Sequence, residues 1–213
     1  MAAKKSSVSR TVSRKSVTKK TATKVVSAKR RSRSTRGEVG SHDHDHVGSG
    51  SNNPDKKPAI KRTYQSPNQS ARNGHSITMV VVHCTEASLS STVATFLDGS
   101  PDGRQVSAHY VIDRNGDIYQ MVPDGQRANH CKGANSNSIG IEHVASMTDR
   151  LTSAQSESSA ALIRWLLQQY DIPSTRVFGH DFAPGYSGGG TSCPDALFGA
   201  HTQQAVRDWV DAN

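Results

Sequence analysis

The sequence predicts an α/β domain preceded by a long disordered basic arm. Three observations predict this organisation: a split in charge along the chain, a first third without large apolar residues, and strand-like segments alternating with helix-like ones after residue 77. The 213-residue chain has a net charge of +8, but residues 1–72 contain 18 basic and 4 acidic residues, whereas residues 73–213 contain 8 basic and 14 acidic ones. We therefore expect a polycationic arm and linker over 1–72 and the folded domain over 73–213.

The expected arm has the composition of a disordered segment. Residues 1–72 lack Leu, Phe, Trp and Cys, so they cannot bury enough apolar surface to offset their conformational entropy. Residues 1–36 contain 13 Lys or Arg and no acid. This stretch is either a solvated tail or a ligand for an anionic polymer (lipopolysaccharide, teichoic acid or nucleic acid) through counterion release. The alternating histidines of residues 42–46 can bind a metal only loosely, because no neighbouring structure fixes their geometry.

The first half of the expected domain contains a strand, a helix and a hairpin. Residues 77–84 form a short, mainly apolar run rich in β-branched residues, which is typical of a buried strand. Residues 88–97 have the pattern of a short helix that ends before Asp98-Gly99. The runs 106–113 and 117–122 flank Asn115-Gly116, and Asn-Gly between two such runs predicts a β-hairpin.

The second half predicts two further strands and two helices. Residues 139–144 resemble a strand, and residues 176–178 form a last short one. Thr152 and Gln155 form a capping box that begins a helix extending to about residue 170. The residues expected on its apolar stripe are Ala161, Leu162, Trp165 and Leu166. A terminal helix over 199–210 is expected to bury Ala205, Val206 and Trp209.

Several classes of protein are excluded. No apolar stretch approaches the length of a transmembrane span, and no apolar segment follows the N-terminal basic residues as a secretory signal requires. We therefore expect synthesis in the cytoplasm without a secretory signal. A uniformly basic nucleic-acid-binding domain is excluded, because the foldable part is net acidic. Three cysteines are too few for a disulfide scaffold, and we expect Cys84 to be a buried free thiol.

Two histidines and a cysteine are candidate metal ligands. His83 lies at the end of the first apolar strand, and His180 follows the last short strand. Cys193 comes after the glycine-rich stretch 185–190 and directly before Pro194. Two imidazoles and a thiolate can hold Zn²⁺ and leave a fourth position open for water. Spacing alone leaves a structural role open for each of them, because 97 positions separate the two histidines.

Five strings of residues around these candidates occur in a characteristic order. They are VHCT at 82–85, VSAHYVI at 106–112, NSIGIE at 137–142, GHD at 179–181 and TSCP at 191–194. Together they resemble the zinc-dependent N-acetylmuramoyl-L-alanine amidases of the type 2 superfamily, which includes phage lysins, cytosolic recycling amidases and peptidoglycan recognition proteins. The resemblance extends over about residues 77–210. It implies a central mixed β-sheet flanked by helices, with a zinc ion in a groove on one face.

The resemblance also implies a role for individual residues. Its three metal ligands correspond to His83, His180 and Cys193, and its general base corresponds to Glu142. Thr191 corresponds to a position near the developing oxyanion. The residues assigned to substrate binding are His130 and His109. Phage-type members often have a catalytic Tyr where this chain has Ala108, so the chain resembles a hybrid of a recycling-type base and a phage-type Cys ligand.

The function implied is hydrolysis of the amide between N-acetylmuramic acid and L-alanine in peptidoglycan. We expect a monomeric phage endolysin or virion-associated lysin, made in the host cytoplasm and reaching the cell wall after a holin opens the membrane. Two alternatives remain within the superfamily: a cytosolic muropeptide-recycling amidase and a non-catalytic peptidoglycan-binding module. A fourth possibility is a nucleic-acid-binding protein in which the arm is the functional part and the amidase-like domain is incidental.

Overall fold

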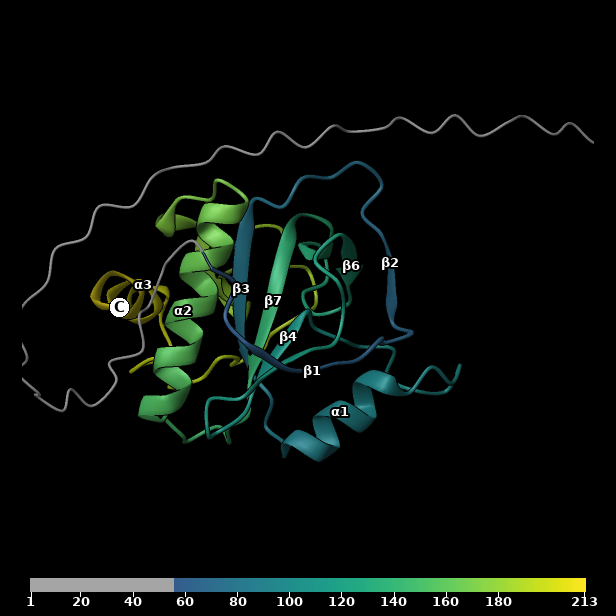
Figure 1. Cartoon of the computed structure of the whole chain (residues 1–213), viewed down its shortest axis with the longest axis horizontal. Helices are drawn as coiled ribbons and strands as arrows, with labels where there is room; N and C mark the ends of the chain where they lie inside the picture. Colours follow the sequence, from purple (N-terminus) through teal and green to yellow (C-terminus); the bar gives the residue numbers. More distant parts are fainter. Residues whose placement is uncertain (1–55) are drawn as a thin grey trace, which may run out of the picture. The chain divides into compact units, whose positions relative to one another are not determined.

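A computed structural model describes residues 56–213, in which eight strands and three α-helices are present (Figure 1). The strands are β1 (Ile60–Thr63), β2 (Gln69–Ala71), β3 (Met79–Cys84), β4 (Tyr110–Ile112), β5 (Ile118–Gln120), β6 (Gln126–Ala128), β7 (Ser138–His143) and β8 (Val177–Gly179). The helices are α1 (Leu89–Leu97), α2 (Ser153–Gln169) and α3 (Gln203–Ala212), with short 3₁₀ turns η1 (Asn135–Asn137), η2 (Ser174–Arg176) and η3 (His180–Phe182). The basic stretch 1–36 and the histidines of 42–46 lie outside the described residues.

The main sheet is mixed, as expected. Its strand order is β1-β5-β4-β7-β3-β8, in which β4 and β5 pair antiparallel and the other neighbours pair parallel. Strands β2 and β6 form a separate antiparallel pair. All six residues of β3 are buried between β7 and β8, which explains why this strand is a continuous apolar run rather than an alternating one.

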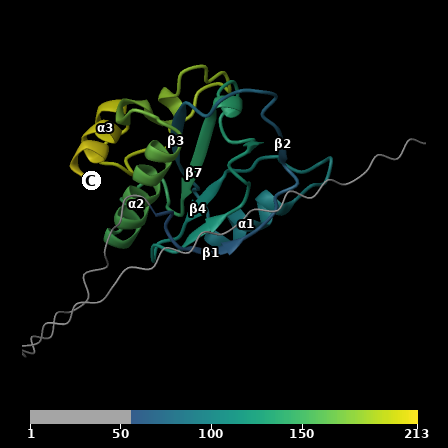
Figure 2. The ribbon, with the colours of Figure 1, turned by 45° about the horizontal axis from the view of Figure 1, so that its top comes forward.

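Helices cover both faces of the sheet (Figures 1 and 2). Helices α2 and α3 lie on one face, where Leu162, Leu166 and Val206 pack in one cluster with Val80 and Val82 of β3. Helix α1 lies on the opposite face, where its Phe96 joins a second cluster. Because successive side chains of a strand point to opposite faces, the odd-numbered residues of β3 point away from α2. The His83 side chain therefore points to the face that α2 and α3 leave uncovered.

The local signals in the sequence are confirmed. The hairpin connects β4 and β5, and Gly116 in its turn has a φ of +86°, a conformation that favours glycine. Thr152 and Gln155 form the capping box at the start of α2. The buried side of α2 includes Leu162 and Leu166 as expected. In α3, Val206 is buried, and Trp209 is partly buried against the core.

The expected domain boundary at residue 72 is wrong, because residues 60–72 belong to the folded domain. Strand β1 pairs with β5, and β2 pairs with β6. Ser66, Asn68 and Arg72 are buried. Apolar composition predicted disorder for this segment. The segment is ordered because hydrogen bonds to distant backbone carbonyls hold it, rather than apolar burial. The Asn68 side-chain amide, for example, donates to the carbonyls of residues 98 and 106.

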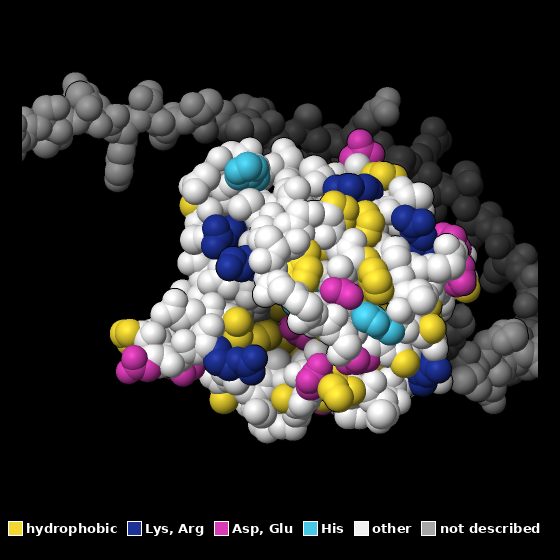
Figure 3. All heavy atoms as spheres, turned by 180° about the vertical axis from the view of Figure 1, so that it is seen from behind, with side chains coloured by type: hydrophobic (Ala, Val, Ile, Leu, Met, Phe, Trp, Pro, Cys, Tyr) yellow, Lys and Arg dark blue, Asp and Glu magenta, His cyan; other side chains and the backbone are white. Residues whose placement is uncertain are grey.

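The surface of the described part gives no sign of a membrane-spanning element. None of its helices combines the length and apolar character that crossing a bilayer requires. On the face seen in Figure 3, basic and acidic side chains are interspersed. Residues 56–213 contain 13 basic and 14 acidic residues, so the excess of basic charge in this chain lies in residues 1–55.

Candidate metal centre and catalytic site

Three neighbouring parallel strands bring the predicted site residues together. Val82 of β3 is in register with Gly179 of β8, so the residues that follow, His83 and His180, leave the two strands side by side. On the other side of β3, His83 is in register with Glu142 of β7. Polar residues at the carboxyl ends of adjacent parallel strands converge at one edge of a sheet, which is a common position for binding sites.

His83, His180 and Cys193 form a compact group of possible metal ligands. One ligand atom from each lies within 4.8 Å of the other two. The Nδ1 atom of His83 is 3.8 Å from Cys193 Sγ, and the ring centroids of His83 and His180 are 4.5 Å apart. The three residues lie 97 and 13 positions apart in the sequence, and the sheet brings them together.

The chemistry of this group fits a zinc ion. Two nitrogens and one sulfur are the donor set of three-ligand zinc sites, which keep a fourth position open. The Nε2 atom of His180 is buried and has no hydrogen-bond partner among the described residues. Burial lowers the pKa of His83, which keeps its imidazole neutral, and raises the pKa of the Cys193 thiol. A bound cation reverses the effect on the thiol, because it stabilises the thiolate.

Glu142 lies beside the metal-ligand group with an oxygen available for chemistry. Its Oε2 atom is buried and lacks a hydrogen-bond partner within residues 56–213. Burial, with a smaller contribution from repulsion by Glu86, raises the pKa of the Glu142 carboxyl to about 8. A buried carboxyl with a pKa near neutrality is typical of groups that exchange protons during catalysis.

Thr191 lies in the loop that carries Cys193. Its Oγ1 atom accepts a hydrogen bond of 3.2 Å from the backbone N–H of Cys193. That bond orients the hydroxyl group and uses one of the two lone pairs of its oxygen. The hydroxyl hydrogen can therefore still be donated to another group. The backbone carbonyl of Cys193 accepts from the N–H of Asp181, which ties this loop to the segment after β8.

The expectation that His109 binds substrate is wrong. The side chain is completely buried, with 0% exposure. Its Nδ1 accepts the N–H of Gly140, and its Nε2 lies 3.1 Å from the carbonyl of Gln126 and 2.9 Å from Arg72. No face of this ring is available to a ligand, because its position between β7 and the β2–β6 pair is filled. Its role is to connect those parts of the domain.

His130 also differs from its expected role. It is partly buried, and both of its ring nitrogens have protein partners: Nδ1 is 3.0 Å from His83 Nε2, and Nε2 is 3.0 Å from Ser138 Oγ. The ring therefore lies behind a candidate metal ligand, with no nitrogen left for a substrate. The resemblance implied a substrate contact for His130, whereas the structure places its ring against His83 and Ser138.

Sequence reasoning missed one aromatic residue at the site. The ring of Tyr186 packs edge-on against His180, with ring centroids 4.6 Å apart, and its hydroxyl donates to the Gly189 carbonyl. The signal in the sequence was its position within the glycine-rich stretch before Cys193. One other expectation is confirmed: Cys84 is a buried free thiol. The hydroxyl of Tyr110 donates a hydrogen bond to Asp124.

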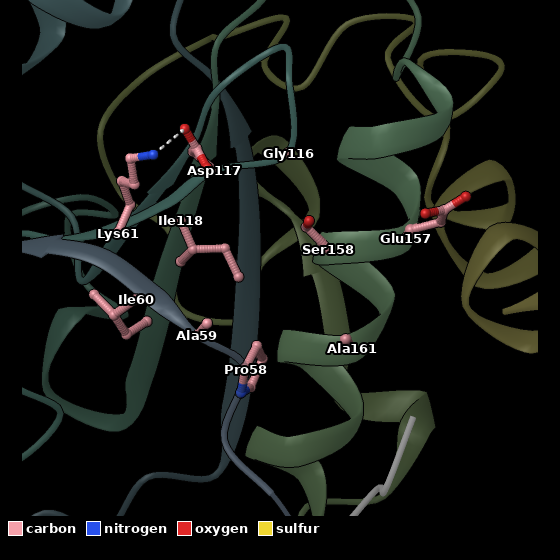
Figure 4. Close-up of a pocket in the computed structure, with 10 residues that line it drawn as sticks. All are labelled: Pro58, Ala59, Ile60, Lys61, Gly116, Asp117, Ile118, Glu157, Ser158 and Ala161. Carbon is pink, nitrogen blue, oxygen red and sulfur yellow. Dashed lines mark ion pairs between the residues drawn. The ribbon is translucent and has the colours of Figure 1, made fainter. Parts of the chain in front are cut away.

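A separate hollow lies between α2 and the β1–β5 edge of the sheet (Figure 4). Its lining includes Pro58, Ile60, Ile118 and Ala161, together with an ion pair of 3.5 Å between Lys61 and Asp117. None of the predicted site residues lines it. Partly exposed ion pairs of this kind contribute little to stability, and this hollow contains no group of buried titratable residues comparable with the metal-ligand group.

Comparison with known proteins agrees with this geometry. A family model described as N-acetylmuramoyl-L-alanine amidase matches residues 73–196. N-acetylmuramoyl-L-alanine amidase A of Achromobacter lyticus is 33% identical over 127 residues, which cover 50% of this chain and 70% of that protein. The 1,6-anhydro-N-acetylmuramyl-L-alanine amidase AmpD of Escherichia coli is 38% identical over 89 residues, or 38% of this chain and 49% of AmpD.

A solved structure shows that the likeness extends to the fold. The crystal structure of a selenomethionine derivative of AmpD superposes with a TM-score of 0.56 at 25% identity, covering 72% of this chain and 96% of that one. Residues 73–196, which the family model matches, contain all five strings around the candidate ligands. The chain therefore belongs to the N-acetylmuramoyl-L-alanine amidase family.

Proposed function

We propose that this chain is a zinc-dependent peptidoglycan hydrolase that cleaves the amide between N-acetylmuramic acid and the L-alanine of the stem peptide. The observation that carries the proposal is the convergence of His83, His180 and Cys193 beside the buried carboxyl of Glu142. Membership of the amidase family supports the same reaction. A non-catalytic binding module does not need a buried general base next to a complete set of metal ligands.

The residues present can perform the chemistry that amide hydrolysis requires. The two histidines and Cys193 would hold the zinc ion; when bound, zinc supplies a Lewis acid that polarises the amide carbonyl and acidifies water nearby. Glu142 accepts a proton from the attacking water and returns it to the amine nitrogen of L-alanine as the C–N bond breaks. Its pKa near neutrality suits both transfers. The Thr191 hydroxyl donates a hydrogen bond to the oxygen that becomes negatively charged.

The test is digestion of purified peptidoglycan with metal content measured in parallel. The wild-type protein should release stem peptides that begin with L-alanine and should contain zinc. Cys193→Ser should lose both properties. The matched control is Cys84→Ser, because the Cys84 thiol is also buried but contacts the carbonyls of Ala145 and Ser146 instead of the ligand group. Intact peptidoglycan after treatment with zinc-loaded wild type would contradict the proposed reaction.

We further propose a biological setting, a phage endolysin or virion-associated lysin that acts on the bacterial cell wall after holin release. The basic stretch 1–36 supports this role, because 13 cationic residues can concentrate an enzyme on anionic wall or outer-membrane polymers. Binding to lipopolysaccharide, teichoic acid and nucleic acid should be compared across salt concentrations. Loss of hydrolysis on intact cells, but not on soluble fragments, after charge removal from 1–36 would support the proposed role of the arm.

A second candidate is recycling of muropeptides in the cytosol. The similarity to AmpD favours it, since that relative is named for an anhydromuropeptide substrate. Purified 1,6-anhydro-N-acetylmuramyl peptides and intact peptidoglycan distinguish the two roles. An enzyme that cleaves only the soluble anhydro compounds is a recycling amidase, whereas a lysin cleaves the polymer.

A further inference from the structure

A chain of hydrogen bonds leads from the interior of the domain to the candidate metal ligand His83. It begins at the backbone carbonyl of Ala134, which is 2.7 Å from Ser138 Oγ. Ser138 Oγ is 3.0 Å from His130 Nε2, and His130 Nδ1 is 3.0 Å from His83 Nε2. On the other side of the His83 ring, Nδ1 is 3.8 Å from Cys193 Sγ. The chain therefore ends at the metal-ligand group.

The direction of each hydrogen bond in this chain follows from its first member. A carbonyl oxygen only accepts, so the single hydroxyl hydrogen of Ser138 points to Ala134. Ser138 Oγ must then accept from His130, which places the proton of His130 on Nε2. A neutral imidazole carries a single hydrogen, so with that hydrogen on Nε2 the Nδ1 atom of His130 has a lone pair. That lone pair can only accept the N–H of His83 Nε2.

The consequence reaches the metal site. A neutral His83 with its hydrogen on Nε2 has its lone pair on Nδ1, the nitrogen that lies toward Cys193. The opposite tautomer would place a hydrogen between the His83 ring and Cys193 and would leave no lone pair for a metal. Hydrogen bonds of this kind to metal-ligating histidines fix the tautomer and the orientation of the ring.

The backbone around His130 is built to hold its ring in place. The Asn135 side-chain oxygen accepts the backbone N–H groups of His130 and Cys131, at 3.0 and 2.6 Å. A Cβ at position 140 would lie 2.4 Å from His130 Cγ, so only glycine leaves room for the ring on this part of β7. Four separate features, Ala134, Ser138, Asn135 and Gly140, thus converge on one orientation of His130.

We propose that His130 is a positioning residue of this enzyme, which accepts the Nε2 hydrogen of His83 and thereby presents His83 Nδ1 to the metal. The inference rests on the metal site of the proposed function. It assigns His130 to metal affinity and ligand geometry instead of to substrate binding.

The test is the zinc dissociation constant, measured by competition with a chelator. His130→Phe keeps an aromatic ring but removes the acceptor, and should weaken zinc binding by about 10–100-fold. His130→Asn places an oxygen at the position of Nδ1 and should restore most of the affinity. Ser138→Ala frees His130 to adopt the other tautomer and should weaken binding as well. The matched control is His75→Phe, since His75 is exposed and away from the site, and its zinc affinity should equal that of wild type.

Cobalt(II) absorption supplies a second readout, because its visible bands report the geometry of the ligands. His130→Phe should shift these bands, and His130→Asn should return them toward the wild-type spectrum. Wild-type zinc affinity with an unchanged cobalt spectrum in folded His130→Phe would overturn the inference and leave the proposed function standing. If His130→Phe does not fold, equal affinities of wild type and Ser138→Ala would overturn it. A wild-type protein that binds no zinc would overturn both proposals.

Discussion

Arg72 offers the sharpest test of how this domain is held together, because the sequence places it in an arm and the structure places it in the core. Its guanidinium is buried and donates to four backbone carbonyls, at 2.9 Å to Asp124, 2.8 Å to Ser136, 2.9 Å to Ser138 and a longer 3.5 Å to Asn135. Replacing Arg72 by Met keeps much of the side-chain volume but removes all three donors. We therefore expect Arg72→Met to destabilise the whole domain.

The size of the effect follows from these contacts. Each buried acceptor that loses a donor costs roughly 1–3 kcal/mol, partly offset because the Arg72 charge no longer has to be desolvated. The sum is about 3–5 kcal/mol, similar to the loss of one partner from a buried ion pair. A domain of ordinary stability, about 5–15 kcal/mol, would remain folded but fragile.

Urea unfolding with a chelator present measures this loss without a contribution from metal binding. With a slope of about 2 kcal/mol per molar urea, the midpoint should fall by about 2 M. Arg104→Met is the matched control, because Arg104 is exposed and should leave the midpoint unchanged. A midpoint shift below about 0.5 M for Arg72→Met would contradict a stabilising role of the buried guanidinium and would agree with a disordered segment up to residue 72.

Three further predictions concern the site and the buried histidines. Glu142→Gln should lower kcat by about 10²–10⁴-fold with unchanged zinc content, because the general base is lost; steady-state kinetics with metal analysis check this, and an unchanged kcat would exclude the role. Thr191→Val should lower kcat by about 10²-fold with little effect on KM, and Thr191→Ser should retain activity, if the hydroxyl stabilises the oxyanion. The domain should become less stable in acid, because burial and the neighbouring Arg72 charge lower the pKa of His109 to about 3. Between pH 6.5 and about 3 the unfolded chain binds a proton at His109 that the folded chain does not, so stability falls by up to about 1.4 kcal/mol per pH unit. Urea unfolding of Glu142→Gln at pH 7.5 and pH 5 measures this loss without the opposite contribution of Glu142, whose raised pKa favours the folded state as the pH falls. Equal or greater stability of this variant at pH 5 would contradict it.

The difference between His109 and His130 shows where reasoning from sequence stops. Both were expected to bind substrate, although His109 lies in a mostly apolar run and His130 in a polar segment, and neither pattern identifies the partners of the ring. In the structure, His109 is enclosed by the Gly140 N–H, the Gln126 carbonyl and Arg72, whereas His130 contacts His83. These partners come from distant parts of the chain. Side-chain roles that depend on such partners cannot be read from local pattern.

The boundary at residue 72 failed for a related reason. Apolar composition predicts burial well for β3 and for α2, where side chains leave water because of the hydrophobic effect. Arg72 and Asn68 are buried because carbonyls of other loops accept their hydrogen bonds. The hydrophobic content of residues 60–72 does not reflect these hydrogen bonds, so composition predicted disorder for this segment.

Local structure and the donor set of the candidate metal-ligand group follow from the sequence alone. The capping box at Thr152, the Asn-Gly turn and the apolar run of β3 act through neighbours within a few residues, and the ordered strings around His83, His180 and Cys193 name the donor atoms. Which nitrogen of His83 faces the other candidate ligands depends on the tertiary structure. That choice depends on a carbonyl 51 positions away, at Ala134, whose inability to donate a hydrogen bond sets the direction of the whole chain.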